Sequence, residues 1–233
     1  MKILIVDQCS NSKSYPNDSA VYDAPELDES SLDSLRAREG VASIPARKLY
    51  TGRQQQYIGD AIDSLRANGH AINRYFISAG FGVVEEDEEL PPYNVTFAEM
   101  TAKEIESRSE TLGISRRVRE LATALTYDLI FFPLGTDYYR ALDMPDVVSS
   151  LPPETLAVAF NQEELAEQFD NVVSIPARTK QAKEQGSIVV ALKGAYLKNF
   201  ADNLALGAEF TSSDDVKAAC LGSPTSQRDL SEF

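Results

Sequence analysis

The chain lacks several side chains on which common catalytic and metal sites depend. Its 233 residues include no tryptophan, a single histidine and two cysteines. The histidine, His70, is expected at a turn between a helix and a strand, so a Ser-His-Asp or Cys-His catalytic site is disfavoured. No group of cysteines and histidines has the spacing of a zinc site. We therefore expect neither a metal ion nor a cofactor.

Long apolar runs and a disulfide framework are missing as well. No run of 18 or more apolar residues occurs, so no membrane-spanning helix is expected. The apolar run near the N-terminus ends after four residues at Asp7, which indicates a buried strand and not a signal peptide. Cys9 and Cys220 lie far apart in the chain and are expected to be reduced thiols. These absences predict a soluble cytoplasmic protein with no membrane partner.

Basic residues are few relative to acidic ones. The chain has 36 acidic and 22 basic residues, which gives a formal net charge of −14. An acidic surface opposes non-specific contact with nucleic acid. It is explained either by a halophilic host or by a specific cationic partner, and the spread of acids along the whole chain favours the halophilic host. A nucleic acid or nucleotide would then bind through a local basic pocket.

The pattern of apolar segments predicts a single α/β domain over residues 1–221, followed by a flexible tail over 222–233. Strand-like and helix-like segments alternate, which is typical of a mostly parallel central sheet with helices on both faces. The expected strands cover 2–7, 71–78, 127–133, 155–160 and 187–192. The expected helices cover 30–38, 51–68, 97–125, 136–142, 162–170 and 193–206.

The loop after the first strand carries the strongest candidate chemistry, because ligands of such sheets bind beyond the carboxyl ends of the strands. It contains Cys9 and Lys13, together with the polar side chains of Ser10, Ser12 and Tyr15. A nearby ammonium favours the thiolate, which is the nucleophilic form of cysteine. Lys13 is thus a candidate to activate Cys9, or to hold a phosphate or carboxylate. The alternative is a small buried cysteine beside a solvated lysine.

A basic segment precedes the first long helix. It contains Arg47, Lys48, Tyr50, Thr51 and Arg53, with Thr51 as a candidate N-cap. Free backbone N–H groups and the helix dipole both favour an anion at such a position. The segment is therefore either an anion site or solvated surface charge.

The second strand is followed by Ser78, Gly80 and Gly82, and then by a Pro-Pro-Tyr turn that ends at Tyr93. Glycines in this position allow the backbone to approach a ligand closely. The third glycine of a dinucleotide fingerprint is missing, so a Rossmann cofactor site is rejected. Tyr93 would either stack on a nucleobase or pack within the loop.

Two later segments complete the candidate site. Thr136, Asp137 and Tyr139 follow the third strand, where Asp137 would act as a base, hydrogen-bond a nucleobase edge, or cap the helix. Lys193 lies at the start of the last long helix and is a second candidate anion contact. A five-residue repeat, SIPAR, occurs at 43–47 and 174–178 and indicates either two similar turns or a coincidence.

The order of these motifs resembles the YaaA-like superfamily, which includes a peroxide-stress protein and uncharacterised small proteins. The resemblance implies a single α/β domain and a role in binding DNA under stress. It covers roughly residues 3–200. The matching positions are Ser10 to Lys13, Tyr50-Thr51-Gly52, Ser78 with Gly80 to Val83, Pro92-Tyr93, Gly135-Thr136-Asp137 with Tyr139, and Lys193.

The first loop is also similar to the catalytic domain of archaeosine synthases, in which cysteine, lysine and tyrosine have the spacing of Cys9, Lys13 and Tyr15. Ser14 replaces the proline of that pattern, the following serine is displaced to Ser19, and the histidine is missing. That group acts on the nitrile of 7-cyano-7-deazaguanine. The resemblance implies a nucleobase-modifying enzyme in which Cys9 attacks the nitrile and Lys13 assists.

In this scheme Asp137 would hydrogen-bond the guanine-like edge and the basic segment would hold phosphate. Two other functions stay open at this stage. One is a non-catalytic DNA-binding protein of the stress response. The other is a different base-processing enzyme, such as a glycosidase.

Overall fold

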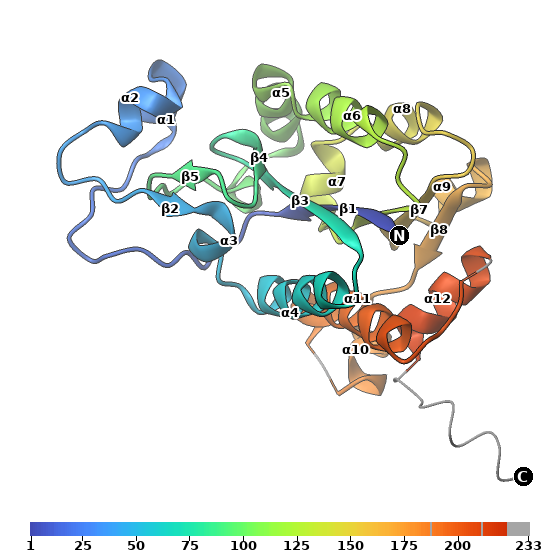
Figure 1. The fold of residues 1–233 in the computed structure, drawn as a ribbon. Helices are drawn as coiled ribbons and strands as arrows, with labels where there is room; N and C mark the ends of the chain where they lie inside the picture. Colours follow the sequence, from blue (N-terminus) through green and yellow to red (C-terminus); the bar gives the residue numbers. More distant parts are fainter. Residues whose placement is uncertain (187, 211, 223–233) are drawn as a thin grey trace, which may run out of the picture.

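A six-stranded sheet in the order β4-β3-β1-β6-β7-β8 runs through the centre of the computed structural model, which describes residues 1–186, 188–210 and 212–222 (Figure 1). All neighbouring strands are parallel except β3 and β4. The predicted α/β fold with a mostly parallel sheet is thereby confirmed. The strands are β1 (Lys2–Gln8), β3 (Ala71–Ser78), β4 (Gly82–Glu85), β6 (Leu129–Phe132), β7 (Leu156–Phe160) and β8 (Val172–Ile175).

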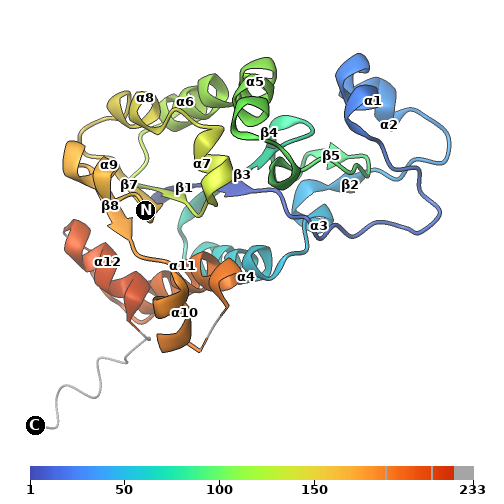
Figure 2. The same ribbon diagram turned by 180° about the vertical axis from the view of Figure 1, so that it is seen from behind.

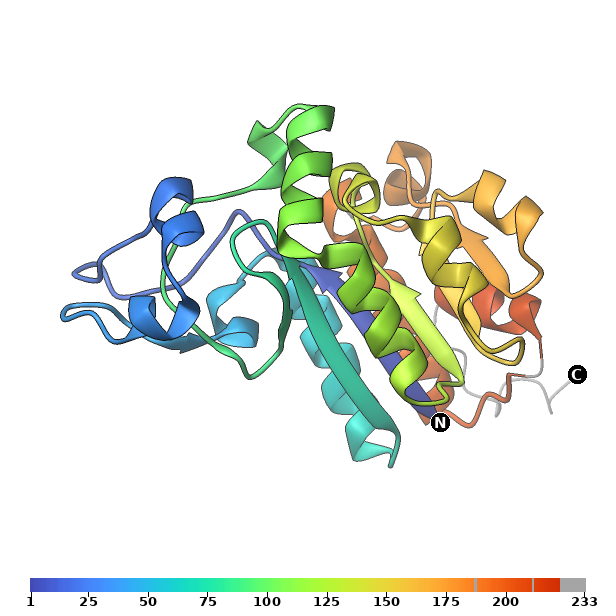
Figure 3. The ribbon, with the colours of Figure 1, turned by 90° about the horizontal axis from the view of Figure 1, so that it is seen from above.

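The strand order reverses at β1. After β1 the chain forms β3 on one side of it, and then crosses to form β6, β7 and β8 on the other side. The loops that leave β1 and β6 therefore lie at the switch point of the strand order, which is where doubly wound sheets bind ligands. Figure 3 shows the strands of this sheet side by side from above.

Helices cover both faces of the sheet (Figures 1 and 2). Leu4 and Val6 of β1 pack into the core on one face, and Ile3 and Ile5 pack into the core on the other. This explains the uninterrupted apolar run, because both faces of the strand are buried. None of the helices in the described ranges is long and apolar enough to cross a membrane. One face carries α5 (Ala102–Leu112), α6 (Ile114–Ala124), α7 (Thr136–Arg140), α8 (Met144–Ser149) and α9 (Glu163–Gln168), and the other carries α4 (Arg53–Ala67), α10 (Thr179–Glu184), α11 (Val189–Ala205) and α12 (Ser213–Leu221).

The polar stretch over residues 8–47 forms an ordered extension beside the carboxyl end of β1 (Figure 1). Tyr22 fixes it: its hydroxyl donates to the Leu35 carbonyl at 3.0 Å, and its N–H donates to the Pro92 carbonyl at 2.9 Å. The extension therefore packs on the Pro-Pro-Tyr turn at 91–93. Its elements are α1 (Ala24–Glu29), α2 (Leu32–Arg36), β2 (Ile44–Pro45) and α3 (Ala46–Leu49), with β5 (Glu89–Leu90) paired antiparallel to β2 and the short 3-10 helix η1 (Phe97–Glu99) nearby.

One predicted strand is wrong. The segment expected as a fifth strand at 187–192 contains the start of α11, and the fifth parallel strand is β8. A short apolar run does not distinguish a strand from a helix, and Val189 and Val190 are exposed at the helix start. The first long helix also begins later than expected, at Arg53, with Gly52 and not Thr51 as its N-cap. Ser187 and the tail expected beyond Gly222 lie outside the described residues.

The two SIPAR segments each lead from a strand into a helix. The first runs from β2 into α3, and the second runs from β8 to the start of α10. In both copies the alanine is buried, while the arginine is exposed and pairs with a carboxylate. Arg47 pairs with Asp87, and Arg178 pairs with Glu163. The helix begins at the alanine in the first copy but only after the arginine in the second, so the two copies share a strand-to-helix connection and not one turn geometry.

Candidate active site

The ends of β1 and β6 meet the starts of α4 and α7 at the point where the strand order reverses. Gln8 is the last residue of β1, and its Oε1 accepts a hydrogen bond from the Gly135 N–H at 2.6 Å. Gln54, in the first turn of α4, donates from Nε2 to the Pro133 carbonyl at 2.8 Å. These bonds join loops that are distant in sequence, as expected for the crevice of a doubly wound sheet.

Cys9 is buried directly beyond β1 and contacts α7. Its Sγ lies 3.0 Å from the hydroxyl of Tyr138, and that hydroxyl also donates to the Cys9 carbonyl at 3.2 Å. With the tyrosine proton directed to the carbonyl, the remaining contact is satisfied by the thiol S–H donating to the Tyr138 oxygen. Burial raises the pKa of Tyr138 far above its usual range, so this hydroxyl stays neutral. The pair can pass a proton away from the sulfur.

A second hydroxyl chain lies beside the thiol. The Tyr93 hydroxyl is 2.8 Å from both the Tyr50 hydroxyl and the Ser78 Oγ. Because the Ser78 Oγ accepts the N–H groups of Gly80 and Phe81, its own proton is directed to Tyr93, which in turn donates to Tyr50. Burial, followed by the proximity of Cys9, raises the pKa of both tyrosines. Tyr93 is therefore packed within its loop and presents no free face for a nucleobase.

Lys13 covers the ring of Tyr93, with Nζ 4.4 Å from the ring centroid. Its backbone pairs with Tyr50 in an antiparallel bridge, which brings the first loop against the basic segment. Burial lowers the pKa of Lys13, while the charges of Cys9 and Glu99 act in the opposite direction. Lys13 is thus placed against Tyr93 and Tyr50, and its activation of Cys9 stays a prediction.

Four predicted residues gather at the N-terminus of α4. A Cβ on Gly52 would lie only 2.5 Å from the Ser10 Oγ, so the absence of a side chain lets Ser10 reach the helix start. Ser10 Oγ also accepts the Ser12 N–H at 3.1 Å, and the Thr51 N–H donates to the Ser12 carbonyl at 3.1 Å. Arg53 is the first, exposed residue of the helix. The N-cap residue, Gly52, has no side chain that could accept a hydrogen bond from the first N–H groups of the helix. These N–H groups are therefore suited to bind an anion.

A buried carboxylate below this helix start was not predicted. Asp7 accepts a hydrogen bond from Arg74 Nη2 at 2.7 Å and from the Gln8 N–H at 2.8 Å. Gln54 and Gln55 add two longer bonds, at 3.2 and 3.5 Å. Asp7 is fully buried and Arg74 is 4% exposed. This network fixes the first turn of α4 against the end of β1.

Lys193 lies at the start of α11, which packs closely on α4. A Cβ on Gly194 would lie 2.6 Å from the Gln54 carbonyl oxygen, so the glycine allows the two helix starts to approach. Lys193 forms no ion pair or hydrogen bond with any residue in the described ranges. Burial lowers its pKa, and the nearby Asp7 opposes this shift. An unpaired, largely buried ammonium beside two helix starts suits a bound anion.

Lys193 is expected to reduce the stability of the protein. The pKa of Lys193 is lower in the folded chain than the 10.5 of an exposed lysine. At a pH between the folded and the unfolded pKa, the unfolded chain binds more protons, so the stability of the protein rises with pH. Lys193→Met should therefore raise Tm at pH 7 by about 2–4 °C, or ~1 kcal/mol. This gain should vanish as the pH approaches 10.5. Lys198→Met is the control, because it loses only the partly exposed pair with Asp202. Equal shifts of Tm in the two variants, measured by thermal unfolding, would refute the prediction for Lys193.

Three predicted residues lie apart from the cluster. The Tyr139 hydroxyl donates to the Phe132 carbonyl at 2.6 Å and accepts the Phe160 N–H at 2.9 Å, so it joins β6 to β7 within the core. Arg47 is engaged by Asp87. Gly82 has φ +73° at the turn between β3 and β4 and is needed for that turn. These three positions have structural explanations.

Three others lie on the rim of the site. Thr136 is the exposed first residue of α7, and Asp137 is half-buried beside it. Gly135, and neither of these side chains, occupies the N-cap position of α7. Tyr15 is half-buried and packs against the core beyond Lys13. Asp137 is therefore placed near Tyr138 and free of a capping role.

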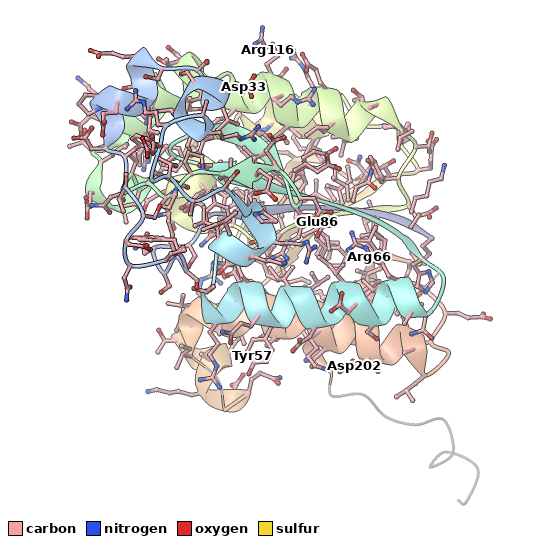
Figure 4. The ribbon with its side chains drawn as sticks, turned by 60° about the vertical axis from the view of Figure 1, so that its left-hand side comes forward. Asp33, Tyr57, Arg66, Glu86, Arg116 and Asp202 are labelled. Atoms are coloured by element: carbon pink, nitrogen blue, oxygen red, sulfur yellow. The ribbon has the colours of Figure 1, made fainter. Side chains whose placement is uncertain are left out.

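A prominent cavity lies away from this cluster. It measures about 840 Å³ and lies at the amino ends of the strands, lined by Met1, Asp128, Leu156 and Phe210 among others. No cysteine, lysine or arginine of the described chain lines it. A second cavity of about 580 Å³ lies beside α4 and reaches Arg74. Arg66 and Glu86 face each other in the wall of this second cavity (Figure 4). We therefore select the site at Cys9 for its reactive side chains and not for the volume of a cavity.

Sequence reasoning missed the residues that hold the site in place. Tyr138 lies next to the predicted Asp137 but was not singled out. Gln8 and Asp7 end an apolar strand, and a charge at the end of a doubly buried strand is itself a signal of a paired partner. The remaining residues of this group are Gln54, Gln55 and Arg74.

The assembled side chains support addition and proton-transfer chemistry. A thiol, an amine and several tyrosine hydroxyls from loops distant in sequence meet in one buried cluster. No group of three histidine, cysteine, aspartate or glutamate side chains within the described ranges is placed to hold a metal ion. A scan against protein-family models finds no match for this chain, and a search of the curated proteins finds none either.

Proposed function

We propose that this protein is a nucleobase-modifying enzyme that adds the Cys9 thiol to the nitrile carbon of a 7-cyano-7-deazaguanine nucleotide in DNA or RNA. The observation that carries the proposal is the contact of 3.0 Å between Cys9 Sγ and the Tyr138 hydroxyl, with Lys13 close by. This arrangement gives a nucleophile, a route for its proton and a positive charge in one place. The resemblance of the first loop to archaeosine synthases points to the same chemistry.

The proposed step is a balanced addition without oxidation or reduction. The sulfur forms a bond to the nitrile carbon, one π bond of the nitrile breaks, and the thiol proton passes through the Tyr138 hydroxyl to the nitrogen. The product is a thioimidate. Water or an amine then adds to the same carbon and the Cys9 thiol leaves with a proton, which yields an amide or an amidine.

Burial of the sulfur favours a nitrile over a bulkier group. Cys9 is only 2% exposed and contacts Tyr138 of α7, so only a slender reacting group would reach its sulfur. A nitrile is linear and two atoms long, and is therefore suited to such an approach. Exclusion of water around the buried sulfur would also strengthen the interaction between Lys13 and the developing charge.

Phosphate binding is assigned to the starts of α4 and α11. Ser10, Arg53 and Lys193 lie there, and the first turn of α4 offers N–H groups without a capping side chain. Lys48 is exposed on the neighbouring α3 and can extend this surface. Asp137, half-buried on the rim, would accept hydrogen bonds from the guanine-like edge.

The charge distribution favours an enzyme over a non-catalytic DNA-binding protein. Most described arginines are paired with carboxylates, and Arg53 and Arg116 are the exceptions among the described arginines. Only Arg53 of these two lies at the site. A protein with a net charge of −14 and paired arginines has little surface for non-specific phosphate contacts. A small local anion site fits a nucleotide substrate better.

The test is turnover by the purified protein. We expect 7-cyano-7-deazaguanine, supplied as a free nucleotide and within single- and double-stranded oligonucleotides, to gain the mass of water or of an added amine. Mass spectrometry of nucleosides would detect the product, and mass spectrometry of the intact protein would detect the thioimidate. Folded protein that leaves the nitrile unchanged in every substrate, with ammonia or a primary amine present, would contradict the proposal.

A further inference from the structure

Gln8 is held rigidly at the centre of the site. Its N–H donates to Asp7 at 2.8 Å, its carbonyl accepts from Gln55 Nε2 at 3.0 Å, and its Oε1 accepts from the Gly135 N–H at 2.6 Å. These partners come from three different elements, β1, α4 and the N-cap of α7. The side-chain amide is therefore fixed in position and orientation before any ligand binds.

The amide nitrogen of Gln8 is left without a partner. The bond from Gly135 assigns Oε1 as the acceptor, so Nε2 carries two N–H donors that point elsewhere. Within the part of the chain that the structure describes, nothing accepts a hydrogen bond from this nitrogen. Gln8 is half-buried at the point where the strand order reverses. A fixed donor pair without a protein acceptor is suited to an electron-rich ligand atom.

The Gln8 amide and the Cys9 thiol face the same short helix. Gln8 contacts Gly135 and Cys9 contacts Tyr138, and the Tyr138 N–H bonds back to the Gly135 carbonyl at 3.0 Å. A Cβ on Gly135 would lie 3.3 Å from Gln8 Oε1 and 3.9 Å from a ring carbon of Tyr138, so both side chains adjoin the same side of Gly135. The amide and the thiol therefore approach the start of α7 from one side, as needed for groups that act on two bonded atoms.

We infer that Gln8 is a catalytic residue whose Nε2 donates to the nitrile nitrogen while Cys9 adds to the nitrile carbon. The inference rests on the proposed function. As the sulfur–carbon bond forms, an electron pair moves from the nitrile π bond to the nitrogen, and the Nε2–H groups stabilise this charge until the thiol proton arrives. A donor that is already oriented stabilises the transition state without a cost of reorganisation.

Gln8→Glu tests the donor while preserving the support of Gly135. The carboxylate still accepts the Gly135 N–H, but it offers no proton and repels the developing charge. We expect kcat to fall by about 100- to 1,000-fold, the loss seen when one such donor is removed, with a smaller change in KM. Gln168→Glu adds the same charge at the exposed end of α9, away from the assigned site, and should keep kcat within about threefold. If wild-type protein turns over and Gln8→Glu keeps its kcat, the inference on Gln8 fails and the proposed function stands.

A second measurement decides the inference without turnover. In a 15N–1H correlation spectrum, the side-chain NH2 pair that disappears in Gln8→Glu identifies Gln8. Addition of 7-cyano-7-deazaguanosine monophosphate should shift this pair, whereas the pair assigned through Gln168→Glu should stay in place. An unshifted Gln8 pair at saturating nucleotide overturns the inference. A shifted pair in a protein that does not turn over supports Gln8 as a ligand donor and rejects the proposed reaction alone.

Discussion

Replacement of Arg74 by methionine is expected to lower the free energy of unfolding by about 3–5 kcal/mol, because it leaves a buried charge without its partner. The Arg74 guanidinium and the Asp7 carboxylate are almost completely removed from solvent and lie 2.7 Å apart. The glutamines that also bind Asp7 donate neutral hydrogen bonds, which are weaker than the bond from a guanidinium. Urea denaturation followed by circular dichroism would measure the change.

Two further variants isolate the cause of this loss. Arg119→Met removes a partly exposed ion pair with Asp146 and is expected to cost less than about 1 kcal/mol. Asp7→Asn combined with Arg74→Met removes both charges, so the double variant should be more stable than Arg74→Met alone. Equal destabilisation by Arg74→Met and Arg119→Met would show that the buried pair is not a major support of the α4 start.

The Asp7 network explains why the site could be located but not completed from the sequence. The apolar run from Ile3 to Val6 is characteristic of a strand buried on both faces, and the rule for doubly wound sheets then places ligands beyond its end. The partner of Asp7, however, lies on another strand, 67 residues away. Such a pairing depends on the register of β1 against β3, in which Ile5 is opposite Arg74. No local pattern specifies that register.

The misplaced fifth strand has a related cause. The segment from Ile188 to Ala191 is apolar and β-branched, which resembles a buried strand. Packing of α11 on α4 overrides this preference, because Gly194 allows close contact and Leu197 and Phe200 bury the helix face. The true strand, β8, ends in the first two residues of the second SIPAR segment. Strand and helix propensity therefore failed where tertiary contact decides the outcome.

Hydroxyl positions around Cys9 were likewise beyond local sequence patterns. Tyr50 precedes α4, Tyr93 follows β5 and Tyr138 lies in α7. The Tyr50 and Tyr93 hydroxyls bond each other and the Tyr138 hydroxyl contacts Cys9, because the polar extension folds back over the end of β1. The sequence allows Tyr93 either to stack on a base or to pack in its loop, and the hydrogen bonds show that it packs. Function at this site thus depends on proton positions that only the folded arrangement defines.

Cys9→Ala is expected to reduce turnover of a 7-cyano-7-deazaguanine substrate by at least about 1,000-fold, because it removes the group that bonds to the nitrile carbon. The thioimidate detected on the intact wild-type protein should disappear as well. Cys220→Ala is a matched control, since Cys220 is also buried and unpaired but lies in the core on the opposite face of the sheet. Burial raises the pKa of the Cys220 thiol, which keeps it protonated and unreactive.

The two cysteine variants separate a chemical role from a packing role. Each removes one buried sulfur, so each should have a similar, small effect on the urea midpoint. Only Cys9→Ala should lose turnover, while substrate binding measured by calorimetry is retained because Ser10, Arg53 and Lys193 are unchanged. Equal turnover by Cys9→Ala and Cys220→Ala would show that the thiol beside Tyr138 is a packed side chain and not the nucleophile.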